Sequence, residues 1–409
     1  MQKKLHFLIL DADTHTITIC QTALESQGHS VTSGNSSSLS LEKLKILKPD
    51  CILCDLSQSS NSLVLITTLR TQKTVAQPSL LIIAPEKPNV DYAQIFQLRV
   101  NGYLTKPLQP DALACTILAA HKGEITVQFW GARGTLPVPG KQTTRYGGNT
   151  NCISLNIAQN HFFIFDAGTG IKELSNYILR TIHHPITAKI FLSHPHYDHI
   201  NGIPFFVPLY LKDNQFEFFG TQHANTGIEK LIADQMDGVY FPITISEFAA
   251  KLIFRDLKEE TFYIDDVEVQ TIFLTHPGKC LGYRIHYLDK LFCYVTDNEI
   301  YPKESPQYDE TIVNRLVDFI TDADVLIMDA TYSDEEYFKK IGWGHSCVSS
   351  VVEIAHHAHV KQLCLYHHDP DQFDKDIDNK VKHAKAILKT LRSKTRCLAA
   401  KEGDVLHLT

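Results

Sequence analysis

The 409-residue sequence lacks long hydrophobic segments. No apolar run approaches the roughly 20 residues that cross a bilayer as a helix, which argues against a membrane protein. Glycine and proline number only 20 and 17 and show no Gly-X-Y period, which excludes a collagen-like chain. Hydrophobic residues make up 44% and charged residues 21%, so the chain does not have the composition of a disordered protein. The formal net charge of −7 argues against a general nucleic-acid-binding protein, which is normally basic.

The cysteines and the N-terminal segment give no indication of export. The ten cysteines lack the tight spacing of a disulfide framework. Cys51 and Cys54 form a C-x-x-C, but they lie inside the apolar run CILCDL, which is typical of a buried strand. The apolar run Leu5–Leu10 is shorter than the core of a signal peptide and stops at Asp11. We therefore expect a buried first strand and a reduced, cytoplasmic protein.

The chain divides into two parts by pattern. At about 150 residues per domain, the length predicts two or three domains. The first 122 residues alternate short apolar runs with helical segments, which predicts a doubly wound parallel sheet. From Ile125 onward, strands come in pairs with Gly and Pro punctuation. We predict domains over residues 1–122 and 125–409.

Acidic residues and a lysine follow the predicted strands of the first part. Asp11 comes after the first strand, Asp55 follows CILC, and Lys106 lies in YLTKPL. An open parallel sheet gathers such groups at the carboxyl ends of its strands. The pattern resembles the receiver domain of response regulators over residues 3–122. The resemblance implies a flavodoxin-like fold, Asp55 as the phospho-acceptor with Asp11 and Lys106 beside it, a Mg²⁺ ion, and a sensor kinase as partner.

Two positions depart from the receiver pattern. Ala12 stands where receivers carry a second acid, and Asp13 comes one residue late. Ile83 stands where the fourth strand normally ends in a Ser or Thr hydroxyl. Two interpretations therefore stay open: a receiver that is phosphorylated on Asp55, and a receiver-shaped domain that serves dimerisation or docking. A homodimer is an expectation under either one.

Histidine is abundant, with 21 residues, of which 17 lie after residue 124. Histidine is the commonest metal ligand in proteins. The segment KIFLSHPHYDHINGIPFF places four potential metal ligands within six residues, directly after the apolar strand Ile190–Leu192. Such ligands converge on one tight loop without the cost of ordering long segments, which predicts a metal pair. These residues are His194, His196, Asp198 and His199.

This segment and several later ones resemble the metallo-β-lactamase fold, an αββα sandwich, over about residues 125–409. The later segments are FIFDAGTG, FLTHPGKCLGYRI, LFCYVTDNE and LCLYHHDP. In this fold the aspartate of FIFDAGTG, Asp166, supports the ligand loop. The resemblance implies one metal on His194, His196 and His276. It implies a second metal on Asp198, His199 and His367, with Asp297 bridging the two.

Five histidines and two aspartates fit Zn²⁺ best, with Mn²⁺ and Fe²⁺ as alternatives. Seven ligands for two metals leave a position open for a reactive water, as a catalytic site requires. Consecutive residues of a strand face opposite ways, so His367 and His368 are not expected to bind metal together.

A second constellation implies an acid catalyst. The strand DVLIMDATYSD ends in Asp329-Ala330-Thr331, and His345 follows in GWGHS. A similar strand end and histidine lie beside the metals in the ribonuclease-Z-like branch of the fold. The resemblance implies that His345, oriented by Asp329, protonates the leaving oxygen, and that Asp198 belongs to the catalytic set. The alternative is that His345 caps a helix that starts near Ser346.

The segments FWGARGTLPVPG, RYGGNTNC and YFPI resemble receiver-fused and stand-alone metallo-hydrolases that are commonly described as cyclic-nucleotide or related phosphodiesterases. We expect hydrolysis of a small phosphodiester, regulated or scaffolded by the receiver-like domain. Candidate substrate contacts are Arg133, Asn149 and His368, with Arg145 nearby and Tyr240 and Phe241 as an apolar wall or core.

Hydrolysis of a thioester or a lactone stays open as another reaction, and two functions of other kinds stay open as well. One is an RNA endonuclease of the ribonuclease Z type. The net charge of −8 over residues 125–409 argues against it, and so does the lack of a Gly/Pro/Lys-rich arm between His199 and His276. The other is a metal-bound signalling or docking protein without turnover. On the same grounds we expect nucleic acid not to be a partner.

Overall fold

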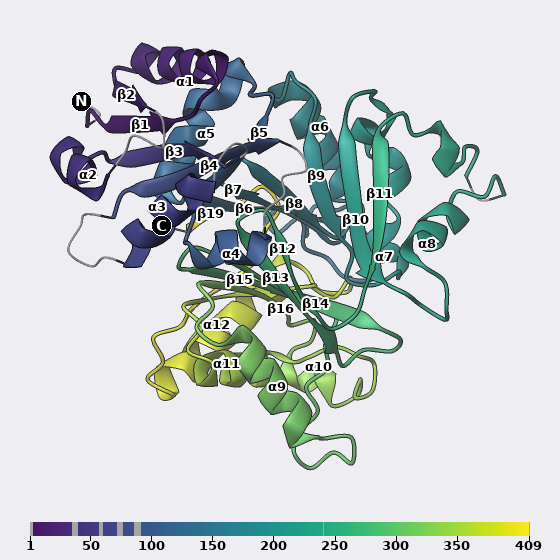
Figure 1. Cartoon of the computed structure of the whole chain (residues 1–409). Helices are drawn as coiled ribbons and strands as arrows, with labels where there is room; N and C mark the ends of the chain where they lie inside the picture. The colour runs from purple at the N-terminus through teal and green to yellow at the C-terminus, as the bar shows by residue number, and fades with distance from the viewer. Residues whose placement is uncertain are drawn as a thin grey trace.

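The computed structural model describes residues 3–34, 40–56, 60–71, 77–85, 91–239 and 241–408. Its N-terminal part is a parallel sheet of five strands in the order β2-β1-β3-β4-β5 (Figure 1). This confirms the predicted flavodoxin-like, doubly wound fold. The strands are β1 (His6–Leu10), β2 (Ser30–Gly34), β3 (Cys51–Asp55), β4 (Ser79–Pro85) and β5 (Gly102–Lys106). The helices are α1 (Thr14–Ser26), α2 (Leu41–Leu47), α3 (Ser60–Thr71), α4 (Tyr92–Gln97) and α5 (Pro110–Lys122).

The rest of the described chain contains two seven-stranded sheets. The first has the order β11-β10-β9-β8-β7-β6-β19 and the second β12-β13-β14-β15-β16-β17-β18. Both sheets mix parallel and antiparallel pairs, as the metallo-β-lactamase fold requires. The first sheet consists of β6 (Ile125–Gly131), β7 (Cys152–Ile157), β8 (His161–Phe165), β9 (Thr187–Phe191), β10 (Gln215–Thr221), β11 (Lys251–Leu257) and β19 (Val405–Leu408). The second consists of β12 (Thr261–Ile264), β13 (Val267–Leu274), β14 (Cys280–Tyr287), β15 (Lys290–Val295), β16 (Val325–Asp329), β17 (Gln362–Tyr366) and β18 (Arg396–Ala399).

Aromatic side chains from both sheets fill the space between them. The ring of Phe165 on β8 stacks on Phe191 of β9 with centroids 5.2 Å apart, and it lies 5.3 Å from Tyr294 of β15 in the other sheet. Helix α6 (Ile171–Thr181) packs against the first sheet. Helices α9 (Glu310–Ile320), α11 (Val348–His357) and α12 (Asp374–Thr390) cover the outer face of the second (Figure 1). The layers therefore alternate helix, sheet, sheet, helix.

Several strands of both sheets end close to one another, and the backbone turns sharply at these ends. Asp166 after β8, Asp297 after β15 and His367 after β17 have φ values of 56°, 40° and 58°. Non-glycine residues rarely adopt this left-handed conformation, which is concentrated at functional sites. These turns direct side chains from separate strands into one small volume.

The receiver-like part packs directly on the sandwich. Only Gly123 and Glu124 separate α5 from β6. The ring of Phe96 in α4 lies 4.9 Å from His286 and 5.5 Å from Tyr263, and Tyr287 donates a hydrogen bond to the carbonyl of Asn101. One hydrophobic cluster runs through both parts. Helix α4 also contacts β13, which ends at Leu274, two residues before His276.

Cys51 and Cys54 are buried within β3, and burial raises the pKa of the Cys51 thiol well above its usual range, so this pair has the environment of core residues. Within the described residues, no helix combines the length and apolar character that crossing a membrane requires.

Candidate metal centre

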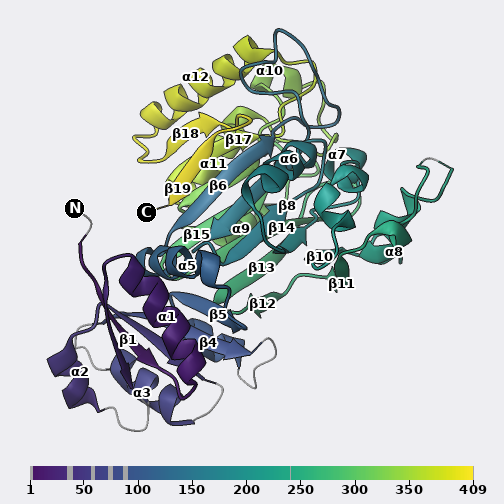
Figure 2. The same cartoon turned by 90° about the horizontal axis from the view of Figure 1, so that it is seen from above.

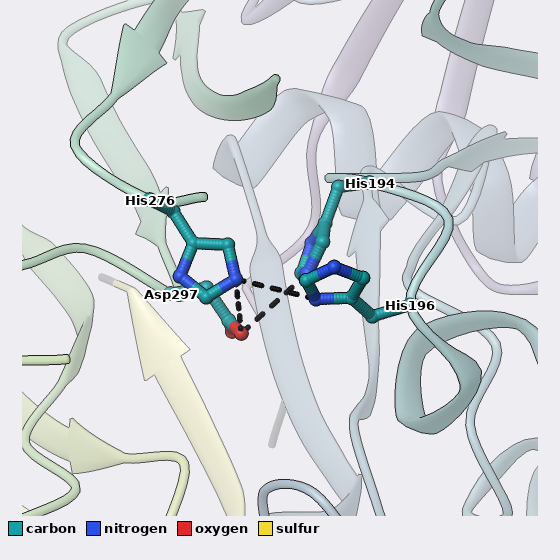
Figure 3. A group of neighbouring side chains, drawn as sticks. All are labelled: His194, His196, His276 and Asp297. Atoms are coloured by element: carbon teal, nitrogen blue, oxygen red, sulfur yellow. Dashed lines mark hydrogen bonds and ion pairs between the residues drawn. The ribbon is translucent and has the colours of Figure 1, made fainter. Parts of the chain in front are cut away.

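Three imidazole rings and one carboxylate converge at the ends of β9, β13 and β15 (Figure 3). The Nε2 atom of His194 lies 2.7 Å from Nδ1 of His196, and Nε2 of His276 lies 3.2 Å from that same atom. The Oδ2 atom of Asp297 is 3.6 Å from Nε2 of His194 and 3.7 Å from Nε2 of His276. Four donor atoms from three segments thus face a common point.

A second group of donors lies on the other side of Asp297. The Oδ1 atom of Asp297 is 3.2 Å from Nε2 of both His199 and His367. The Oδ2 atom of Asp198 is also 3.2 Å from Nε2 of each ring. The two oxygens of Asp297 therefore face different donor groups, which is the arrangement of a bridging carboxylate.

The donor geometry fits a pair of divalent cations. Zinc ligands at about 2.0–2.2 Å in tetrahedral geometry lie roughly 3.3–3.6 Å from one another. Most of the separations above fall within a few tenths of an ångström of that range. The donor set of imidazole and carboxylate is also one that Zn²⁺, Mn²⁺ and Fe²⁺ accept. We accordingly take the seven predicted ligands as the proposed metal centre.

The ring nitrogen that points away from the cluster has a partner in four of these histidines. Nδ1 of His199 lies 2.7 Å from Oδ2 of Asp166, and Nδ1 of His276 lies 2.9 Å from the carbonyl of Gly344. Nδ1 of His194 is 3.0 Å from Ser193 Oγ, and Nδ1 of His367 is 3.0 Å from Thr331 Oγ1. Such partners fix the tautomer and ring orientation of metal-binding histidines. Asp166 therefore holds the ligand loop, as the resemblance implied.

Charge and burial favour the metal-binding protonation state at Asp198, Asp297 and His194, whereas at His199 burial lowers the pKa but Asp198 and Asp297 raise it well above its usual value. Burial alone would raise the pKa of Asp198 and Asp297, but the surrounding histidines hold both pKa values well below the usual range. Burial, together with neighbouring imidazoles, holds the pKa of His194 well below its usual value. Ionised carboxylates and neutral imidazoles are the forms that coordinate cations.

His345 lies beside this cluster and pairs with Asp329. Its Nδ1 is 2.8 Å from Oδ2 of Asp329, and its ring stacks 4.7 Å from that of His367. Burial lowers the pKa of His345, but Asp329 and then Asp297 more than offset this and raise it to about 9. Helix α11 begins at Val348 with Cys347 as its N-cap, so His345 does not cap that helix. The geometry supports the predicted acid.

The three predicted substrate contacts are engaged elsewhere. Arg133 is 0% exposed and donates to the carbonyls of Gly147, Asp369 and Gln372. Asn149 donates through its backbone and side chain to Glu402. His368 is buried with Nε2 3.1 Å from the carbonyl of Ala400. Each of the three side chains connects separate segments of the fold through hydrogen bonds, because a buried donor requires a partner. We therefore do not include direct contact between these residues and the substrate in the proposed function.

Two neighbouring predictions have a similar outcome. Arg145 is exposed and pairs with Asp378 on α12. Phe241 packs with its ring 5.4 Å from that of Phe205, at the edge of the core. Tyr240 lies outside the described residues.

Sequence reasoning missed two groups that hold Asp198. The backbone N–H of Thr135 donates to Oδ2 of Asp198 over 2.7 Å, and Nδ2 of Asn151 donates to the same atom over 3.1 Å. Asn151 lies within the segment RYGGNTNC, but that motif does not predict the hydrogen bond from Asn151 to Asp198. A backbone donor such as Thr135 leaves no trace in residue type.

In the receiver-like part, the acids and the lysine meet as predicted. Nζ of Lys106 lies 2.8 Å from Oδ2 of Asp55 and 3.1 Å from Oδ2 of Asp11. Asp13 instead caps α1 by accepting from Thr16 and His15. Ile83 pairs with Asp55 in register and is buried, so this position offers no hydroxyl. Both open interpretations of the receiver remain.

Comparison with known proteins agrees with this architecture. Residues 161–368 match the model of the β-lactamase superfamily domain, and residues 7–118 match the response regulator receiver domain. A ribonuclease Z of Oceanobacillus iheyensis is 24% identical over 288 residues, which cover 58% of this chain and 90% of that protein. A ribonuclease Z of Streptococcus suis is 28% identical over 294 residues, with coverage of 58% and 90%.

A solved structure shows the same fold. The metallo-β-lactamase fold protein YhfI from Bacillus subtilis matches with a TM-score of 0.51 and 18% identity, covering 70% of this chain and 100% of that one. The family match spans just over half of the chain, from β8 to the end of β17 and His368. The chain therefore belongs to the β-lactamase superfamily, as a metal-dependent hydrolase of that fold that carries a response regulator receiver domain at its N-terminal end.

Proposed function

We propose that the protein is a phosphodiesterase that uses two divalent cations, with Zn²⁺ favoured, to hydrolyse a small phosphodiester such as a cyclic nucleotide. The observation that carries the proposal is the pair of donor groups that share Asp297, with the His345–Asp329 pair beside them. Two cations of this kind neutralise phosphoryl oxygens and lower the pKa of a water molecule when they are bound.

The residues of the chain supply the remaining chemistry. Nδ1 of His345 is engaged by Asp329, which leaves Nε2 to carry a proton toward the substrate. A ribose alkoxide is a poor leaving group, so a proton donated to it in the transition state accelerates cleavage. Thr135 and Asn151 fix the carboxylate of Asp198, so the site is ordered before substrate binds.

Charge favours a small substrate over a structured RNA. Helix α8 (Ile228–Asp234) and the chain after it stand out from the sandwich in Figure 2. Residues 222–250 contain four acidic residues and one lysine, a net charge of −3. A surface that grips RNA needs cations against the phosphates. This projection therefore has the wrong sign for that purpose.

A ribonuclease-Z-like endonuclease is the second candidate. The similarity to ribonucleases Z over 90% of their length favours it, and the expectation that nucleic acid is not a partner has no support from that similarity.

The receiver domain also points to a sensor kinase as partner. A cytoplasmic location, a homodimer, and the boundaries at residues 122 and 125 remain predictions.

One experiment separates the two functions. Metal-reconstituted full-length protein is offered cyclic mononucleotides, cyclic dinucleotides and a 3′-extended tRNA precursor at 50 and 200 mM salt. We expect turnover of at least one cyclic nucleotide with weak salt dependence. Selective cleavage of the tRNA precursor that falls steeply with salt would instead establish the endonuclease. If metal-loaded protein turns over none of these substrates, the result would favour a metal-bound signalling or docking protein without turnover.

Phosphorylation of the receiver domain is tested by labelling with acetyl phosphate and Mg²⁺. Asp55 lies beside Lys106 as a phospho-acceptor requires, so we expect the full-length protein to take up label and the D55A variant to take up none. A D50A variant alters a carboxylate elsewhere on this domain and should label normally. Absence of Asp55-dependent label leaves the docking interpretation.

A further inference from the structure

A buried carboxylate connects two parts of the proposed metal centre that are distant in sequence. Glu299 follows β15, two residues after Asp297, and is 2% exposed. Its backbone N–H donates to the carbonyl of Thr275 over 2.8 Å. Thr275 directly precedes His276 in the sequence. The backbone of Glu299 thus already joins the segment that carries one proposed metal ligand to the segment that carries the bridging one.

The side chain of Glu299 accepts hydrogen bonds from a second segment, the tight loop that contains Gly342 and Gly344. Oε1 accepts the backbone N–H of Gly342 and Oε2 accepts that of Gly344, each over 2.7 Å. Tyr337 adds a third hydrogen bond to Oε1 through its hydroxyl, over 2.9 Å. The Glu299 carboxyl group presents two acceptor oxygens to these donors, whereas an amide would replace one of them with a donor.

The loop of Gly342 and Gly344 has a backbone conformation that requires glycine. Gly342 and Gly344 have φ values of +88° and +87°, which side-chain-bearing residues rarely adopt. A Cβ added to Gly344 would also lie 2.5 Å from Nδ1 of His276. Two glycines cost more conformational entropy on ordering than other residues do, so their ordering needs fixed hydrogen bonds. Glu299 supplies those bonds.

The loop in turn orients the two functional histidines. The carbonyl of Gly344 accepts from Nδ1 of His276 over 2.9 Å, which leaves Nε2 facing His196 and Asp297. The next residue is His345, whose Nδ1 meets Asp329. The Glu299 carboxylate therefore supports the loop that positions both His276 and His345, although it contacts neither ring.

We propose that Glu299 is the positioning residue of this site: through Gly344 it sets the tautomer and direction of His276, and through the same loop the place of His345. The inference rests on the proposed metal centre. Partners of this kind behind metal ligands change metal affinity or activity by about 10–100-fold when they are altered. The donor group that contains His276 should be affected most, because within the described residues Glu299 makes no direct hydrogen bond to Asp198, His199 or His367.

The test compares Glu299→Gln with two matched variants in full-length protein. Glu217→Gln makes the same change in the Lys189–Glu217 pair of the first sheet, and Tyr337→Phe removes the third donor but leaves both loop bonds. Stepwise Co²⁺ and Zn²⁺ affinities are measured by competition with a chromophoric chelator, with the Co²⁺ absorption spectrum and the Tm of metal-free protein alongside.

For Glu299→Gln we expect one of the two affinities to fall by about 10–100-fold with a changed Co²⁺ spectrum, while the other stays within about threefold of wild type. Glu217→Gln and Tyr337→Phe should keep both affinities. Wild-type affinities in Glu299→Gln would overturn the inference, and so would an equal loss at both sites accompanied by a large fall in Tm, which indicates a general structural role. Wild-type protein that binds no metal would refute the proposed function itself, which is a separate outcome.

Discussion

The His196→Ala variant is expected to lose the proposed phosphodiesterase activity almost entirely. Nδ1 of His196 faces the nitrogens of both His194 and His276, so its removal opens one donor group (Figure 3). Cation pairs contribute several kcal/mol of transition-state stabilisation. We expect kcat/KM for bis-p-nitrophenyl phosphate to fall on the order of 10³-fold or more, equivalent to about 4 kcal/mol.

The matched control is His183→Ala, which removes an exposed histidine ahead of β9. It should retain wild-type activity and metal content. Elemental analysis of the same samples connects the loss to the metal, because His196→Ala should bind less than wild type. Full activity in His196→Ala, with a folded protein, would remove the basis of the proposed centre. Asp198→Ala should behave like His196→Ala.

The His345→Asn variant should slow cleavage according to the leaving group. An acid that protonates a departing ribose oxygen contributes about 10²–10⁴-fold, so kcat for a cyclic nucleotide should fall by that factor. The p-nitrophenolate anion departs without a proton, so bis-p-nitrophenyl phosphate should lose less than about tenfold. Equal losses on both substrates would contradict the acid role and indicate damage to the metal centre.

The pH profile gives a second reading of His345. The acid must be protonated, and Asp329 raises its pKa to about 9, so its contribution is present below that pKa and is lost as the pH rises through it. Bound cations disfavour a further positive charge nearby, which moves this descending limb to a pH no higher than about 9. The limb should be absent in His345→Asn and should shift to lower pH in Asp329→Asn, because Asp329 is the main cause of the raised pKa.

Sequence reasoning succeeded where the chemistry determines both residue type and spacing. The segment from His194 to His199 places its ligands on one short loop after β9, and the strand-end aspartates lie where their motifs implied. Four strands of the receiver domain followed from short apolar runs, of which those of β3 and β4 are largely buried, whereas β2 (SVTSG) has no such run and was not predicted. In these cases each local pattern has one structural solution.

The failures have a different physical origin. Arg133 lies in a Gly-rich segment and was predicted to contact substrate, but its guanidinium turns inward and donates to carbonyls of segments more than 200 residues away. Glu299 was overlooked because its partners are backbone N–H groups, which any residue possesses. Contacts between residue types can be predicted from sequence, whereas contacts to the backbone depend on the folded path of the chain.

The continuous core between the receiver domain and the sandwich determines what kind of regulation is physically available. A tethered domain acts by docking and release, and its linker length sets the local concentration. Here two residues separate the domains and shared apolar packing joins them, so release would expose that packing to water. A structural change at Asp55 would therefore reach the sandwich through packed contacts, and β13, which contacts α4, ends two residues before His276.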